Sequence, residues 1–282
     1  MNTLKRVEPL SVAYLFPELD MLLLGYLRKL SPADWERKTV APQWSVKDVA
    51  AHLLDSNIRA LSFLRDNQPG ETVETPRSYN DLVVFLNELN AEWIRAFRRV
   101  SPAVLIDLLE ITGKPFCERM QSLDPSAPAR FAVAWAGESE SANWFHVARE
   151  YTEKWHHQQQ IRLAAGDDDV LLTERLYLPH LDASMRGLPH HYRTVMAQAG
   201  TVIRFTVSGL DNARWYLVRE NDRWDLFSDH DGPVSCSVEI DGRIAWRIFT
   251  KGISRVEARA HLRIEGEQGL GARVLDMTAV KA

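Results

Sequence analysis

The sequence predicts an all-helical domain followed by a small α+β domain. Along the first two thirds of the chain, apolar residues recur at three- and four-residue steps, which is the period of an amphipathic helix. Near Gly200 the period changes to two, which is typical of strands with one buried face. We therefore expect a helical domain over residues 1–198 and an α+β domain over residues 199–282.

The first two helices are indicated by apolar spacing and by a cap. Apolar side chains recur from Val12 to Leu30 at helical steps. The second helix begins at Ser45, whose hydroxyl can cap the backbone while Asp48, three residues on, closes a capping box. It is expected to end near residues 67–70, where proline and glycine follow one another.

The remaining helices of the first domain are marked by capping residues, prolines and glycines. We expect one to begin at Ser78 or Asn80, one to begin at Ser101-Pro102, a long one over residues 141–165, and one over residues 173–198 that is interrupted at Pro179 and Pro189.

The second domain alternates short strands with helices. Strands are expected over residues 202–207, 215–218, 224–227 and 234–240, followed by a helix over residues 243–249, an alternating strand over residues 256–264 and a short helix over residues 272–277.

The composition is that of an ordinary soluble globular protein, with 45% hydrophobic and 26% charged residues. A net charge of −4 gives no electrostatic reason to expect a nucleic acid or an anionic membrane as partner. No apolar run approaches the roughly 20 residues that span a bilayer. Because Cys117 and Cys236 are the only cysteines, no disulfide framework is expected, and a reducing cytoplasm fits best. The sequence assigns no oligomeric state.

Three residues form a candidate metal site. Glu153 and His157 lie four residues apart in the long helix, so both side chains share one face and can hold one ion. His52 lies on the inward face of the second helix, where an imidazole needs a polar partner. Two histidines and one carboxylate suit zinc, nickel, iron or cobalt, and three protein ligands leave coordination positions open for reactants.

Each of these residues also has an ordinary structural interpretation. A single buried histidine such as His52 can donate to a backbone carbonyl, and Glu153 can pair with a neighbouring basic residue. His156 competes with His157 for the ligand role, although the four-residue spacing favours His157. Spacing by itself leaves these alternatives open.

A second candidate feature is a basic pair in the α+β domain. Arg247 and Lys251 are expected one turn apart on the helix of the second domain. They form either a solvated basic face or a clamp for an anionic substrate group, and we take Arg247 as the candidate catalytic residue. Arg243 and Arg255 are alternatives for that role.

Two segments, WSVKDVAAHL at residues 44–53 and REYTEKWHHQQQIR at residues 149–162, resemble motifs of the mycothiol-dependent maleylpyruvate isomerase family, a branch of the DinB-like metal-binding bundles. The first segment is similar to the opening motif of the family's N-terminal domain, and the second segment is similar to its second metal motif. The family's ligand roles carry over to His52, Glu153 and His157. The family's second domain, related to sterol-carrier-type folds, matches the change of period near residue 198.

The resemblance implies an up-and-down four-helix bundle with a divalent metal held between facing helices. Zinc is the first choice of metal, with nickel or another transition metal as alternatives, and the cofactor is a low-molecular-weight thiol such as mycothiol. A metal-bound thiol has a lowered pKa and can add as thiolate to a small electrophilic substrate. Thiol transfer or isomerisation is thus the expected function. A metal-assisted hydrolase, or a non-enzymatic stress-response module that binds an apolar ligand, is the alternative.

Overall fold

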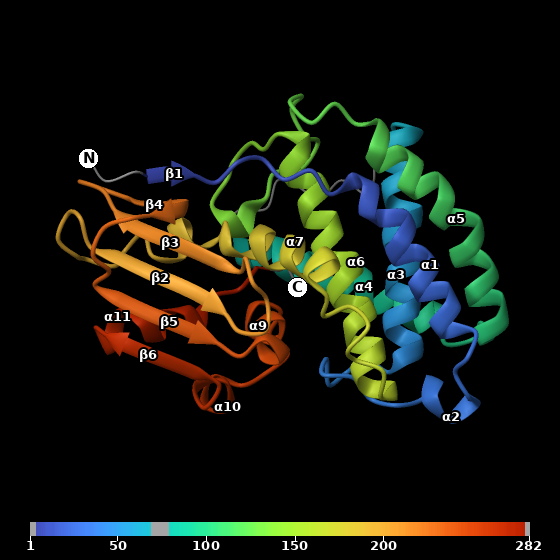
Figure 1. Ribbon diagram of the computed structural model, residues 1–282. Coiled ribbons are helices and arrows are strands. Elements are labelled where there is room, and N and C mark those ends of the chain that lie inside the picture. The colour runs from blue at the N-terminus through green and yellow to red at the C-terminus, as the bar shows by residue number, and fades with distance from the viewer. Residues whose placement is uncertain (1–3, 69–78, 280–282) are drawn as a thin grey trace. The chain divides into compact units, whose positions relative to one another are not determined.

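The computed structural model describes residues 4–68 and 79–279, which pack into two compact units (Figure 1). The helical unit comprises the described parts of residues 11–132 and 141–168, and the sheet unit comprises residues 4–10, 133–140 and 169–279. The predicted class, a helical bundle with a following α+β domain, is confirmed. The domain boundary between residues 198 and 199 stays a prediction, because compact units reflect packing and not independent folding.

The helical unit is a bundle in which α5 and α6 each pack against both α1 and α3, while α4 packs against α3. Its elements are η1 (Ala13–Leu15), α1 (Phe16–Leu27), α2 (Pro32–Trp35), α3 (Val46–Ala60), the π-helical turn η2 (Leu61–Arg65), α4 (Tyr79–Phe97), α5 (Pro102–Ser122) and α6 (Asn143–Ala165). The predicted start at Ser78 lies outside the described residues, as do Pro69 and Gly70.

The first turn of α3 has the capping box that the sequence predicts. The backbone N–H of Asp48 donates to Ser45 Oγ over 3.3 Å, and the backbone N–H of Ser45 donates to Asp48 Oδ2 over 3.0 Å. These bonds satisfy donors that a helix start otherwise leaves unpaired. Because they fix where α3 begins, they also fix which of its residues face the core. His52 is one of them, between the buried Ala51 and Leu53.

The sheet unit contains a mixed sheet with strand order β1-β4-β3-β2-β5-β6, in which only the β2–β5 pair is parallel (Figure 1). The strands are β1 (Leu4–Arg6), β2 (Val202–Val207), β3 (Arg214–Arg219), β4 (Trp224–His230), β5 (Cys236–Ile240) and β6 (Leu262–Gly266). Its helices are η3 (Ala134–Ala136), α7 (Glu174–Met185), α8 (Leu188–His191), α9 (Gly242–Phe249), α10 (Arg255–Arg259), α11 (Gln268–Ala272) and η4 (Arg273–Asp276).

Specific contacts hold these helices to one another and to the sheet. Tyr177 Oη of α7 donates to the carbonyl of Gly242 over 2.8 Å and accepts from the backbone N–H of Trp246 over 3.0 Å, which joins α7 to α9. At Gly271 of α11, a Cβ would lie 2.6 Å from Ile264 Cγ2 on β6. Glycine there lets α11 approach the sheet closely.

The strand predicted over residues 256–264 is wrong in its first half. Residues 255–259 form α10, and only Leu262–Gly266 pair as a strand. The reason is local: Ser254 Oγ accepts from the backbone N–H of Glu257 over 3.2 Å and caps a helix start. The short helix predicted over residues 272–277 is also replaced, by the end of α11 and the 3-10 turn η4.

The helix predicted over residues 173–198 ends early, and its first predicted interruption is wrong. α7 runs through Pro179 without a break. The helix ends at Met185. A short helix, α8, then runs to His191 with Pro189 in its first turn, where a missing N–H costs little. The short edge strand β1 was not predicted, because three residues carry too little periodicity.

Candidate metal centre

Two helices of the bundle supply the candidate ligands. α3 carries His52, and α6 carries Glu153 and His157 on one face. His52 and His157 are 6% and 7% exposed, whereas the Glu153 side chain keeps 24% of its surface accessible. The centre is thus largely withdrawn from water, with its carboxylate nearest the solvent.

The three side chains converge. One ligand atom from each of His52, Glu153 and His157 lies within 4.8 Å of the other two. His157 Nε2 is 3.3 Å from Glu153 Oε2, and the His52 and His157 ring centroids are 4.6 Å apart with an interplanar angle of 71°. Ligands about 2.1 Å from one ion are separated by at most about 4.2 Å, so small side-chain adjustments suffice to bind one. The donor set therefore fits a single transition metal ion.

The surroundings favour the protonation states that metal ligands need. Burial, followed by the nearby His157, holds the pKa of His52 well below its usual range. Burial by itself would raise the pKa of Glu153, but its histidine neighbours, His157 first, outweigh that effect and hold the pKa low. A neutral imidazole and an ionised carboxylate are the forms that coordinate metals.

Gln160 contacts the ring of His157 from the next turn of α6. Gln160 Oε1 is 2.9 Å from His157 Nδ1, and this amide oxygen can only accept, so the proton belongs on Nδ1. The Nε2 lone pair is then left facing Glu153, which is how an outer partner orients a ligating histidine. Gln160 was not predicted as a site residue, although its three-residue spacing from His157 was a usable signal.

His156, the alternative ligand, is directed differently. Its Nδ1 donates to the carbonyl of Thr152 over 2.7 Å, and burial, followed by the charge of His157, lowers its pKa to about 3. It is not among the residues whose ligand atoms converge. An aromatic side chain borders the convergent group instead: the Trp44 ring centroid is 4.9 Å from that of His52 and 6.0 Å from that of His157.

Comparison with known proteins places this bundle in a family. Residues 17–162, more than half of the chain, match the model of the mycothiol maleylpyruvate isomerase N-terminal domain. The chain belongs to this family. Two solved structures of the mycothiol-dependent maleylpyruvate isomerase, one of them a histidine-to-alanine mutant, have the same fold as this chain, each with a TM-score of 0.54. Each is 12% identical to this chain, and the alignment covers 90% of this chain and 92% of the other. No curated protein matches the chain.

The family match spans all three candidate ligands, since positions 52, 153 and 157 lie inside residues 17–162. Across residues 4–68 and 79–279, none of the helices has the length and apolarity that crossing a bilayer requires.

The candidate arginines lie in the sheet unit, and each binds a residue of that same unit. Arg247 Nε donates to the carbonyl of Gly252 over 3.0 Å, and its Nη2 is 3.9 Å from Glu257. Arg243 pairs with Asp169, and Arg255 pairs with Asp276. The prediction that Lys251 shares a helix with Arg247 is wrong. α9 ends at Phe249, and Lys251 has a left-handed backbone with φ of 59°.

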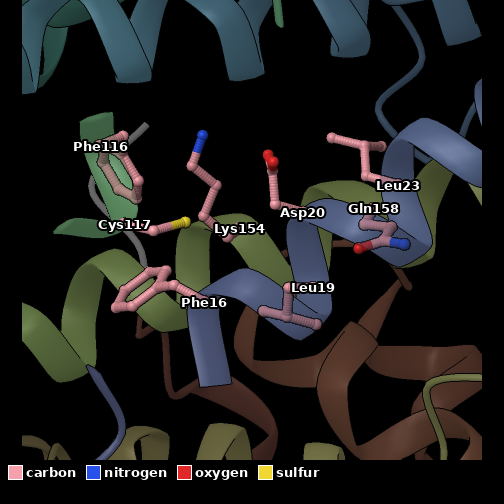
Figure 2. A pocket seen from close by; sticks show the side chains of 8 residues that line it. All are labelled: Phe16, Leu19, Asp20, Leu23, Phe116, Cys117, Lys154 and Gln158. Atoms are coloured by element: carbon pink, nitrogen blue, oxygen red, sulfur yellow. The ribbon is translucent and has the colours of Figure 1, made fainter. Parts of the chain in front are cut away.

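A small cavity lies on another face of α6, among α1, α5 and α6 (Figure 2). Its charged groups are Lys154 and Asp20, which extend in the same direction from α6 and α1. Burial lowers the pKa of Lys154 to about 8 and raises that of Asp20. The remaining lining side chains are Phe16, Leu19, Leu23, Phe116, Cys117 and Gln158.

Proposed function

We propose that this chain is a divalent-metal-dependent enzyme that activates a low-molecular-weight thiol for transfer to, or isomerisation of, a small electrophilic substrate. The observation that carries the proposal is the convergence of His52, Glu153 and His157 to within 4.8 Å in a member of this family. Solved structures with the same fold are those of a mycothiol-dependent maleylpyruvate isomerase. That name supports a thiol cofactor here, and we propose mycothiol.

The residues fit the metal that the proposal requires. His52 Nδ1 is buried and has no hydrogen-bond partner in the described part of the chain. An unpaired buried nitrogen costs about 1–3 kcal/mol, so a ring in this state is better explained as a ligand than as a structural histidine. The donor set suits zinc first, and nickel or another transition metal next. When bound, such a metal lowers the pKa of a thiol and stabilises the thiolate near neutral pH.

The protein's own residues supply charge and orientation. Glu153 contributes the single negative charge among the three ligands, and Gln160 keeps the His157 proton on Nδ1. The half-buried Trp44 ring borders both imidazoles. With only three protein ligands, further coordination positions remain for a thiol. We propose Arg247 as the residue that binds an anionic group of the substrate, and the cytoplasm as the compartment.

The test combines metal analysis with a thiol-dependent assay. Purified protein should carry about one transition metal ion per chain, bind mycothiol, and isomerise maleylpyruvate only when the thiol is present. His157→Ala and His52→Ala should each lose metal and activity together. His156→Ala is the matched control, because it removes the neighbouring imidazole of the same helix and should retain the metal.

Two outcomes would overturn the proposal. One is full metal occupancy in both His52→Ala and His157→Ala. The other is turnover of esters or amides at the same rate with and without thiol, which would favour metal-assisted hydrolysis.

A further inference from the structure

Lys154 follows the ligand Glu153 in sequence but lies on a different face of α6. Its Nζ donates to the backbone carbonyl of Leu53 over 3.1 Å and to Oδ1 of Asn57, both on α3. Leu53 in turn follows the ligand His52. Lys154 and Leu53 are therefore hydrogen-bonded to each other, and each comes directly after a candidate ligand in sequence.

A series of hydrogen bonds connects Lys154 to a third helix, α5. Asn57 is fully buried, and its Nδ2 donates to Thr112 Oγ1 of α5 over 3.0 Å. Thr112 Oγ1 donates to the carbonyl of Leu108 over 2.8 Å. The relay thus runs from α6 through α3 to α5, and each acceptor has a defined partner.

The ammonium group is held on its remaining sides by α5 and α1. It lies 4.5 Å from the ring centroid of Phe116, a cation–π distance. Asp20 of α1 lines the same cavity and attracts the charge of Lys154 (Figure 2). Three helices, α1, α3 and α5, therefore surround this one side chain of α6.

The separation of α3 and α6 decides whether the metal centre forms. His52 comes from α3 and the other two ligands come from α6, so a shift between these helices moves one ligand relative to the pair. Metal–ligand distances tolerate errors of only about 0.2 Å. A direct bond between the helices, one residue from the ligands, is well placed to limit such shifts.

We propose that Lys154 is a positioning residue for the metal centre. By joining α6 to Leu53 and Asn57 of α3, it sets the helix separation at which His52 meets Glu153 and His157. This inference rests on the proposed function, because it assumes that the three residues bind a metal. It assigns Lys154 a role in ligand geometry in addition to any contribution to stability.

The experiment measures metal affinity and ligand geometry in the full-length protein. Zn²⁺ affinity is obtained by competition with a chromophoric chelator, and geometry by the visible absorption of the Co²⁺-loaded protein. Lys154→Met keeps the apolar stem and removes the donors, and it should weaken Zn²⁺ binding about 10- to 100-fold, as loss of an outer-shell partner does. The Co²⁺ spectrum should change with it, which a loss of stability alone would not cause.

Two further variants make the comparison specific. Lys154→Arg retains a charged donor and should recover most of the affinity. Lys47, in the first turn of α3, also donates to a backbone carbonyl, that of Arg98. The Lys47→Met variant is the control and should bind Zn²⁺ like the wild type. If Lys154→Met does not fold, Asn57→Ser removes the side-chain acceptor and leaves the bond to the Leu53 carbonyl, so it should lose more than twofold in affinity but less than Lys154→Met.

The outcomes separate the two proposals. Suppose that the wild type binds Zn²⁺, and that the Zn²⁺ affinity of the variant that breaks the bond is within about twofold of the wild-type value with an unchanged Co²⁺ spectrum. The positioning role is then wrong and the proposed function stands. If the wild type binds no metal, the proposed function fails and the positioning role fails with it.

Discussion

His157 has two ring nitrogens with different neighbours, Gln160 at Nδ1 and Glu153 at Nε2. The amide oxygen of Gln160 keeps the proton on Nδ1, so the lone pair lies on Nε2, beside the carboxylate. The ligand role of His157 thus depends on a residue that is not itself a ligand.

Replacing Gln160 tests this dependence. Gln160→Leu should lower Zn²⁺ affinity by about 10-fold, because the ring loses the acceptor that selects its tautomer. Gln160→Glu keeps an acceptor at the same position and serves as the control, with affinity equal to or above that of the wild type. Chelator competition measures both, and equal binding by Gln160→Leu and wild type would contradict the assignment.

Cys117 lines the cavity beside Lys154, and burial raises the pKa of its thiol to about 12. At pH 8 roughly one thiol in ten thousand is ionised, so the reactive thiolate is nearly absent. We expect the native protein to resist alkylation at Cys117 by iodoacetamide and the denatured protein to react fully, as peptide mass spectrometry would measure. Modification of native Cys117 at the rate of a free cysteine would refute this expectation.

At the scale of elements, the close packing of α1 and α5 depends on Gly113. A Cβ there would overlap the carboxylate of Asp20 on α1. Gly113→Ala should lower the free energy of unfolding by about 1 kcal/mol, because an overpacking cost of about 1–3 kcal/mol exceeds a helix-propensity gain of about 1 kcal/mol.

Gly25 of α1 is the matched control for Gly113, since a Cβ there meets nothing within 4 Å. Gly25→Ala should raise the free energy of unfolding by about 0.4–1 kcal/mol. Urea denaturation followed by circular dichroism measures both variants. Equal shifts of the same sign would show that the Asp20 contact does not constrain α5.

The elements that the sequence predicted best are long and have clear caps. α3 begins where Ser45 and Asp48 indicate, and α6 ends before Gly166, as predicted. The errors are the helix predicted over residues 173–198, which breaks after Met185, and several short segments, among them α2 of the helical unit and the segment over residues 256–264. Over residues 256–264, alternating apolar residues favour a strand, whereas the side chain of Ser254 caps a helix. A few residues carry too little periodicity to decide between the two.

At the scale of the whole molecule, metal binding and folding should be coupled. A ligand set drawn from α3 and α6 exists only in the folded bundle, so Zn²⁺ binds the folded state in preference. With free Zn²⁺ at a hundred times its dissociation constant, the free energy of unfolding should rise by about 2.7 kcal/mol. Thermal unfolding with added Zn²⁺ and with EDTA measures this shift.

His157→Ala provides the control for that measurement. The variant lacks one ligand, so its unfolding temperature should be the same with Zn²⁺ as with EDTA. A Zn²⁺-dependent shift as large as that of the wild type would place the stabilising ion elsewhere in the protein.

The sequence by itself determined the helical and α+β halves, the start of α3, and the shared face of Glu153 and His157. These features depend on periods and caps within a few residues, which local backbone geometry enforces. Only the tertiary structure decided that His52 joins that pair, that Gln160 selects its tautomer, and that Lys154 bonds Leu53 across 101 positions of the chain. The physical reason is that a periodic pattern indicates which face of a helix is buried, whereas the packing of distant helices determines what that face meets.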